Sequence, residues 1–160
     1  MRADFSIREY APCDRDGVLE CVAELLDYEG ALEPTHYGGR IAPAHLDWLL
    51  QQCAARAGRI LVGLREGRVR GYVCAWMREP FGEHLARPEE AAYVSDLFVR
   101  PEERGSGLGR ALLRAAEAFV GERGGGPVTL IVLARNAAAR RFYSAAGYRE
   151  FELRLVKGLD

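Results

Sequence analysis

The stretch from Arg104 to Arg110, RGSGLGR, holds three glycines in seven residues between two arginines. An apolar run over 93–99 precedes it, and an alanine-rich apolar segment over 111–120 follows it. A glycine-rich turn between a strand and a helix can bind an anion, because the first amides of a helix lack internal partners and glycine lets a phosphate come close. The spacing alone leaves a phosphate-binding turn and an ordinary turn equally open.

The common nucleotide-binding motifs do not fit this stretch. No Gly-Lys-Ser/Thr follows it, so it is not a P-loop, and its glycines are ordered GxGxG rather than GxGxxG. The next predicted strand runs into Arg135 and Asn136, without the acidic residue of a dinucleotide-binding fold.

Asp96 is a charge inside the otherwise apolar run YVSDLFV. A buried carboxylate is costly unless it is paired or functional. It could take a proton from a substrate, directly or through water, or hold a cation. The alternative is a structural carboxylate that pairs with an arginine or caps nearby backbone.

Composition narrows the class of protein. The 160 residues fit one domain, residues 1–160, and 22 Lys and Arg against 23 Asp and Glu leave a net charge of −1. Without a basic excess, binding to nucleic acid through phosphate attraction is not expected. The four cysteines and three histidines show no metal-ligand spacing. No apolar run reaches the length of a membrane span and the N-terminus lacks an export signal, so we expect a cytoplasmic protein that uses no membrane.

Hydrophobic periodicity predicts the elements that position these residues. Helices are expected after a cap at Asp14 or Asp16, from Pro43 to about residue 57 with Gly58 as its cap, from Leu108 to about residue 120, and over 137–146. Loops are expected over 28–40 and 80–90. Strands are expected over 5–9, 60–65, 69–78, 93–99, 128–134 and 148–156, with a hairpin turn at 66–67. The order indicates one α/β domain with a mixed sheet of about six to seven strands and four helices. Because βαβ crossovers are right-handed, the strands over 93–99 and 128–134 should be parallel.

Two segments together resemble the GNAT superfamily of N-acetyltransferases. The segment Val99–Gly109 is similar to the acetyl-CoA-binding segment of that family, whose pattern is Arg or Gln, two residues, Gly, one residue, and Gly or Ala. The pattern is met by Arg104, Gly107 and Gly109. A second block of the family is matched by Asn136, Ala139, Phe142, Tyr143, Gly147 and Tyr148. The two blocks stand in the right order and separation, which makes the resemblance specific.

The resemblance implies acetyl-CoA as cofactor and a GNAT-like fold. The pyrophosphate would lie on the turn before the third helix, and the pantetheine arm would pair with the strand over 93–99, where it splays from its parallel neighbour. A strand amide near Leu97 or Phe98 would polarise the acetyl carbonyl. The cofactor-binding residues implied are Leu97, Phe98, Val99, Arg104, Gly105, Ser106, Gly107, Leu108, Gly109, Arg110, Asn136 and Tyr143.

Acetylation of an amine needs a neutral amine and a proton for the leaving thiolate. The resemblance gives the role of general acid to Tyr143, which could instead be a core aromatic like its neighbour Phe142. Asp96 is the candidate base, with Glu102, Glu103 or water as the alternatives. Diamine acetyltransferases, which the stretch around Asp96 resembles, carry a glutamate at the position of Ser95, so the match to polyamine chemistry is incomplete.

In this family the acceptor site is usually built by the first two helices and the loop between them, together with the loop before the strand that holds Asp96. Acidic and aromatic residues there suit a cationic amine; the predicted substrate-binding residues are Asp27, Tyr28, Glu29, Trp76 and Asp96. The expected substrate is a small primary amine: a polyamine, an aminoglycoside or an amino acid. Acetylation of a protein N-terminus or lysine, and a non-catalytic acyl-CoA sensor, are the alternatives. The resemblance also allows a homodimer.

Overall fold

Five strands form one mixed sheet in the computed structural model, which describes residues 4–78 and 91–158. The strands lie in chain order, and each of the first four is antiparallel to its neighbour, whereas the last two are parallel as expected. They are β1 (Ser6–Glu9), β2 (Arg59–Arg65), β3 (Arg68–Met77), β4 (Ala92–Val99) and β5 (Val128–Leu130).

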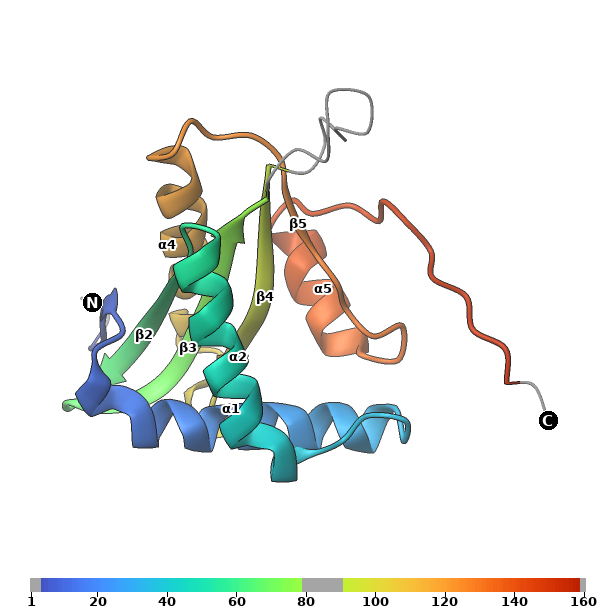
Figure 1. Cartoon of the computed structure of the whole chain (residues 1–160), viewed down its shortest axis with the longest axis horizontal. Coiled ribbons are helices and arrows are strands. Elements are labelled where there is room, and N and C mark those ends of the chain that lie inside the picture. Colours follow the sequence, from blue (N-terminus) through green and yellow to red (C-terminus); the bar gives the residue numbers. More distant parts are fainter. Residues whose placement is uncertain (1–3, 79–90, 159–160) are drawn as a thin grey trace.

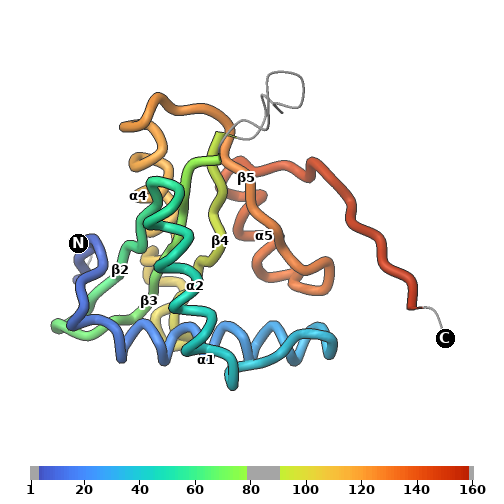
Figure 2. Tube along the Cα trace, viewed as in Figure 1, coloured from blue at the N-terminus to red at the C-terminus, as the bar shows by residue number. Residues whose placement is uncertain are grey.

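Helices cover both faces of this sheet (Figure 1). They are α1 (Arg15–Leu32), α2 (Ala42–Ala55), α4 (Leu108–Gly121) and α5 (Ala137–Ala145). The helices α1 and α2 pack on one face and α4 packs on the other, while α5 lies beside β5. The trace in Figure 2 shows α1 running below the ends of the strands and α2 rising in front of them.

The core is divided into two layers by the sheet. On one face, Tyr72 and Phe98 pack against Leu46 of α2 and Val22 of α1. The other layer joins the opposite side chains of the sheet to the apolar stripe of α4, which includes Leu108, Leu112, Ala116 and Phe119. Burying each large apolar side chain contributes about 1.5–3 kcal/mol, so these two layers hold the helices to the sheet.

A β-bulge at Ser95 interrupts β4. Cys74 pairs with Asp96 and Ala75 pairs with Val94, which leaves Ser95 as an extra residue without a partner on β3. Val94 points into the layer beneath α4, whereas Asp96 bonds to groups on the opposite face. The bulge therefore reverses which face the alternate side chains of β4 occupy.

The two parallel strands separate beyond the bulge. Only the stretch from Ala92 to Val94 pairs with β5, at Val128–Leu130. In the described ranges, Leu97 to Val99 pair with β3 on one side and have no strand on the other. This gap, visible in Figure 1 as the divergence of β4 from β5, exposes backbone groups that need hydrogen-bond partners.

Several local expectations are confirmed. Glu66 and Gly67 both have positive φ, 52° and 73°, as a two-residue hairpin turn requires. The second helix begins at Ala42, one residue before Pro43, and the helix after the glycine turn begins at Leu108. The expectation that Gly58 caps the second helix is wrong, because Ala57 has the left-handed backbone after α2, with a φ of 48°.

Three larger expectations are also wrong. The loop predicted from residue 28 begins later, because α1 continues to Leu32. The strand predicted over 128–134 ends at Leu130, and residues 148–156 form no strand, so the sheet has five strands instead of six to seven. The C-terminal segment leads away from the domain (Figure 1), with Leu153 and Leu155 83% and 90% exposed. Its alternating pattern lacks a neighbouring strand here, and a strand without a partner is not stable. The loop predicted over 80–90 lies outside the described residues.

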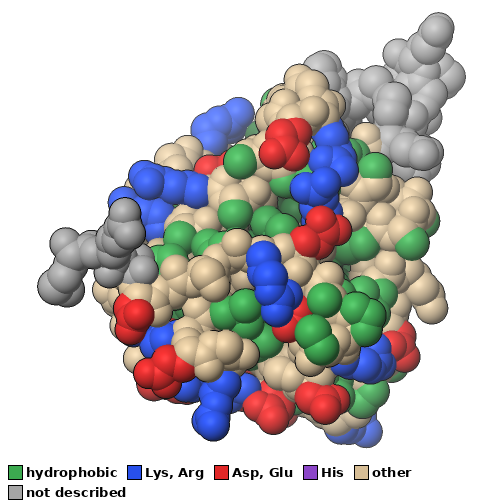
Figure 3. All heavy atoms as spheres, turned by 90° about the vertical axis from the view of Figure 1, so that its left-hand side faces the viewer, with side chains coloured by type: hydrophobic (Ala, Val, Ile, Leu, Met, Phe, Trp, Pro, Cys, Tyr) green, Lys and Arg blue, Asp and Glu red, His purple; other side chains and the backbone are tan. Residues whose placement is uncertain are grey.

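The surface shows no single-sign field on the face drawn in Figure 3, where basic and acidic side chains are interspersed. Among the described residues, no group of three or more His, Cys, Asp or Glu side chains could hold a metal ion. None of the described helices is long and apolar enough to cross a membrane.

Candidate functional site

The turn between β4 and α4 has the backbone that its glycines predict. Gly105 and Gly107 have positive φ values of 79° and 89°, and Gly107 is the residue at which α4 is capped. A side chain on either glycine would meet no protein atom within 4 Å. The backbone conformation therefore requires these glycines, and the space above them is open to a ligand.

Free amides converge at this turn. In the part of the chain that the structure describes, the amides of Gly105, Gly107, Gly109 and Arg110 donate no hydrogen bond. Ser106 Oγ donates to the carbonyl of Glu103 at 2.7 Å, which closes the turn from the inside. Unpaired amides at the start of a fourteen-residue helix attract a phosphate through hydrogen bonds and the helix dipole. The residues present thus fit the pyrophosphate of a CoA molecule.

A polar chain joins this turn to α1 and α5. The Arg104 guanidinium lies over the ring of Tyr28, 5.6 Å from its centroid. The Tyr28 hydroxyl donates to Asn136 Oδ1 at 3.3 Å, and the same oxygen accepts the amide of Ala139 at 3.1 Å. Asn136 is therefore the cap of α5 as well as a neighbour of the proposed cofactor site.

Asp96 is the centre of a second cluster, on the α1 and α2 face of β4. Its Oδ2 accepts from Tyr72 Oη at 2.8 Å and from His45 Nε2 at 2.9 Å, and its Oδ1 accepts from Ser95 Oγ at 2.7 Å. The Asp96 residue is only 6% exposed. Among the described residues, the basic partner of Asp96 is a histidine from α2 and not the arginine that one structural alternative named.

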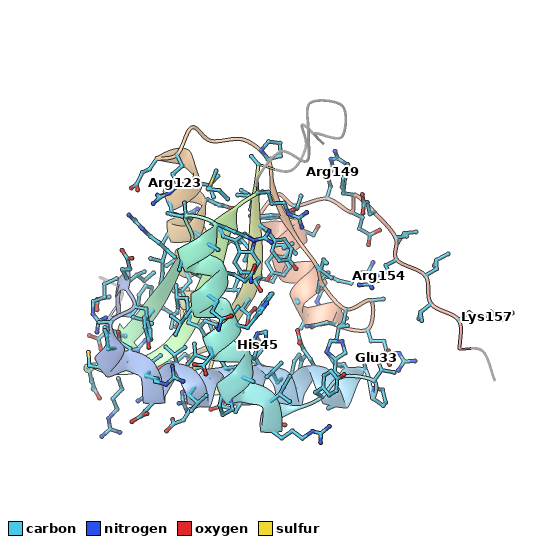
Figure 4. The ribbon with its side chains drawn as sticks, in the orientation of Figure 1. Glu33, His45, Arg123, Arg149, Arg154 and Lys157 are labelled. Atoms are coloured by element: carbon cyan, nitrogen blue, oxygen red, sulfur yellow. The ribbon has the colours of Figure 1, made fainter. Side chains whose placement is uncertain are left out.

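The sequence did not point to His45 as a site residue. The spacing of the three histidines indicates no metal site, and nothing else near His45 in the sequence indicates a function. Burial lowers the pKa of His45, but the hydrogen bond to Asp96 and the charges of Asp96 and Glu29 outweigh that effect and raise the pKa. The His45 side chain is 21% exposed and lies on the side of α2 that faces α5 (Figure 4).

Glu29, Tyr93 and Tyr143 surround this cluster from three elements. Burial raises the pKa of Glu29, and the charge of Asp96 raises it further. The Tyr143 pKa lies well above its usual value, because the phenol is buried and because Asp96 and Glu29 oppose its ionisation. Tyr143 therefore stays protonated at neutral pH, as a proton donor must.

An aromatic wall borders the same space. Trp76 makes an edge contact with Trp48, with centroids 5.6 Å apart, and a tilted contact with Tyr93 at 5.4 Å. Trp48 in turn lies beside His45 at 5.7 Å. Trp76 itself is 4% exposed, so it supports Trp48 and Tyr93 and presents little surface of its own.

Other candidates lie elsewhere. Asp27 is exposed, and its Oδ1 accepts the amide of Gly39 at 2.6 Å, which fixes the loop after α1. Glu103 is buried and bonds to Arg65 Nε at 3.0 Å, and Glu102 pairs with Arg70 at 3.3 Å. These two glutamates tie the glycine turn to β2 and β3.

Comparisons with known proteins agree with this geometry. The profile of the acetyltransferase (GNAT) family matches residues 23–148. An uncharacterized N-acetyltransferase of Methanocaldococcus jannaschii, MJ1207, is 33% identical over 157 residues, which are 96% of this chain and 64% of that protein. The chain thus spans less than two thirds of that relative, and 29% of the streptothricin acetyltransferase of Streptomyces lavendulae, to which it is 42% identical over 55 residues, 34% of this chain.

Solved structures share the fold. The BH1408 protein from Bacillus halodurans superposes with a TM-score of 0.83 at 20% identity, over 96% of this chain and 99% of that one. The acetyltransferase AAC(6')-Iy, in complex with a bisubstrate analog of CoA and acetylneamine, superposes with a TM-score of 0.71 at 16% identity, over 98% of both chains. Since the family profile covers most of the chain, including both the glycine turn and the helix of Tyr143, the chain belongs to the GNAT family of acetyltransferases.

Proposed function

We propose that this protein transfers an acetyl group from acetyl-CoA to a primary amine of a small molecule. The observation that carries the proposal is the meeting of two features at one end of β4. A turn with free amides lies at its carboxyl end, and an acidic and aromatic cluster surrounds Asp96 just before it. The first suits a CoA phosphate and the second suits an amine.

GNAT enzymes use acetyl-CoA as the acetyl donor, and this chain has residues to hold it. The amides from Gly105 to Arg110 would bind the pyrophosphate, with the Arg104 guanidinium nearby. The open side of Leu97 to Val99 would supply backbone partners to the pantetheine amides. An amide of that same stretch, at Leu97 or Phe98, would polarise the acetyl carbonyl.

Tyr143 is our candidate for the general acid. Its raised pKa keeps the hydroxyl protonated, so that it can give a proton to the departing CoA thiolate. Asp96 is the carboxylate on which removal of the amine proton depends. The charge of Asp96 acts on Tyr143, which supports the proposal that both residues serve the same site.

The acceptor is a cationic amine on this proposal. Glu29 and Asp96 supply negative charge from α1 and β4, and Tyr93 and Trp48 supply aromatic faces that attract a cation. Tyr28 lies between the cofactor turn and α5 and would contact whichever substrate spans the two. The solved complex of AAC(6')-Iy with an acetylneamine analog makes aminoglycosides the first amines to test.

Thermal melting with acetyl-CoA tests the cofactor, because a ligand of the folded state raises the melting temperature. Incubation of the protein and acetyl-CoA with aminoglycosides, polyamines and amino acids, with detection of free CoA thiol, tests the acceptor. We expect stabilisation by acetyl-CoA and thiol release with at least one cationic amine. Absence of any stabilisation would contradict the cofactor site, whereas stabilisation without turnover would favour a binding or sensor domain.

We also propose that two copies associate through the C-terminal segment. Its side chains Leu153, Leu155 and Val156 are 83%, 90% and 96% exposed, which is unusual for three apolar residues so close together. Light scattering on the full chain and on a chain ending at residue 150 tests this assembly. Equal monomeric masses for both would refute it.

A further inference from the structure

We infer that His45 is the general base of this site, and that Asp96 positions it instead of accepting the substrate proton itself. The inference rests on the proposed function and names a residue that neither the motifs nor the family resemblance pointed to. It rests on four contacts: the bonds from Tyr72, His45 and Ser95 to Asp96, and the contact of His45 with Trp48.

The carboxylate of Asp96 already accepts three hydrogen bonds and is buried. Tyr72, His45 and Ser95 together occupy both oxygens, and the residue is 6% exposed. With both oxygens engaged and the residue buried, Asp96 offers a substrate ammonium little accessible surface to which it could give a proton. Burial and the nearby charge of Asp96 raise the pKa of Tyr72 far above its usual value, so its hydroxyl remains a donor and holds Asp96 in place.

His45 is the exposed member of the same cluster. A carboxylate only accepts, so Nε2 must carry the proton of the 2.9 Å bond to Asp96, and the lone pair is on Nδ1. No described residue forms a hydrogen bond with Nδ1 of His45. The ring is 21% exposed, against 5% for the Asp96 side chain, and it stacks near Trp48 at the edge of the aromatic wall. This nitrogen is therefore the basic atom that an incoming amine can reach.

The charges around the ring suit this role. The titratable groups that face the cluster are Glu29 from α1, His36 beside Glu29, Tyr72 and Cys74 from β3, Tyr93 and Asp96 from β4, Cys53 from α2 and Tyr143 from α5. The acids Asp96 and Glu29 stabilise the imidazolium, whereas the phenols remain neutral. His45 can thus accept a proton from an ammonium and give it to solvent between turnovers.

The proton balance is complete. His45 Nδ1 takes one proton from the R–NH₃⁺ acceptor, and the neutral amine attacks the acetyl carbon. The C–N bond forms, the C–S bond breaks, and the sulfur takes a proton from Tyr143, which recovers it from the nitrogen that becomes the amide. The products are the N-acetyl amine, CoA thiol and one proton, which His45 releases to water.

The test compares His45→Gln and Asp96→Asn with wild type in the pH dependence of kcat, using an amine found active in the panel. For His45→Gln we expect kcat to fall by about a hundredfold or more, with loss of the wild-type inflection, since general bases contribute about 10²–10⁴-fold. For Asp96→Asn we expect the inflection to move to lower pH, because the interactions that raise the pKa of His45 are gone and burial remains. A merely structural Asp96 would leave the inflection in place.

Asp47→Asn is the matched control, because Asp47 lies two residues further along α2, is 54% exposed and pairs with Arg15 away from the cluster. It should keep wild-type rates. Acetyl-CoA binding by calorimetry and thermal melting shows that each variant is folded. A His45→Gln variant that is folded and keeps the pH inflection would overturn the inference, as would an Asp96→Asn variant that leaves the inflection unmoved.

Nuclear magnetic resonance titration of His45 separates this inference from the proposed function. The pKa of the His45 imidazole should lie above its ordinary value in wild type, and it should be lower in Asp96→Asn than in wild type. Both results are expected whether or not any amine is acetylated. If acetyl-CoA binds but no amine in the panel reacts, the assignment of the acceptor is wrong. If the pKa of His45 does not change in Asp96→Asn, the coupling between His45 and Asp96 is wrong.

Discussion

Gly107 and Gly109 provide a paired test of the glycine turn. Gly107 has a φ of 89°, a conformation that costs a residue with a side chain roughly 1–2 kcal/mol. Gly109 lies in the first turn of α4 with ordinary helical backbone, and an added methyl would lie 3.5 Å from Val99 and 3.6 Å from Phe142, in normal contact. The same substitution by alanine should therefore have opposite effects at two positions two residues apart.

For Gly107→Ala, we expect the free energy of unfolding to fall by about 1–2 kcal/mol, which lowers the melting temperature by roughly 2–8 °C in a domain of this size. The methyl itself meets no protein atom, so the loss comes from the backbone alone. For Gly109→Ala, a better helix former should leave stability unchanged or raise it by up to about 1 kcal/mol.

Acetyl-CoA binding should separate the two variants further. If the Gly107 backbone relaxes to a negative φ, the free amides of the turn change direction and lose charge-assisted hydrogen bonds, each worth about 1.5–3 kcal/mol. Calorimetry should then show at least a tenfold weaker Kd for Gly107→Ala, while Gly109→Ala keeps wild-type affinity. A Gly107→Ala protein with unchanged melting temperature and affinity would refute our interpretation of the turn.

Four further substitutions test the site and the packing around it. Glu103→Gln should lower stability by roughly 1–3 kcal/mol in urea unfolding, because it leaves two arginines without their buried partner, whereas Glu102→Gln, at 56% exposed, should change it by less than about 1 kcal/mol. Tyr143→Phe should reduce kcat about a hundredfold and leave the acetyl-CoA Kd unchanged, and an undiminished kcat would remove Tyr143 as the acid. Burial raises the pKa of Cys21 to about 11 from 9.0, so the folded state keeps this proton longer than the unfolded chain, and stability should fall as the pH rises from 9.0 to about 11. Cys21→Ala should weaken that dependence in melts across the range, and an identical slope would show that other groups cause it.

The glycine turn could be found from sequence because its constraint is local. A positive φ at Gly105 and Gly107 and free amides at the start of α4 depend only on residues within one turn. Asp96 could be found for a similar reason, since a charge in an apolar strand is unusual wherever the strand lies. In both cases the residue type itself carried the signal.

His45 could not be found in this way, because its role depends on a partner 51 residues away in the chain. Its neighbours on α2 show a helix with an apolar stripe, which says nothing about which strand that helix crosses. The strand predicted for the C-terminal segment was wrong for the opposite reason, because its local pattern was clear but its partner is missing among the described residues. FELRLV alternates as a strand should, but strand pairing needs an available edge, and in this structure the segment meets none.

The bulge at Ser95 links the two halves of the site. Before the bulge, Val94 points toward α4, and after it Leu97 and Val99 do the same. In a regular strand, residues three apart point to opposite faces, so the bulge is what puts Val94 and Leu97 on the same face. If Ser95 continued the regular alternation of β4 instead of forming a bulge, Asp96 would point into the apolar layer beneath Leu112 and Ala116 of α4, where no histidine or tyrosine could satisfy it. The same extra residue marks the point where β4 parts from β5. The bulge thus lies where the strand edge that acetyl-CoA would need begins, and the Asp96 carboxylate just after it points toward His45, so the proposed donor and acceptor sites meet at this place in the sheet.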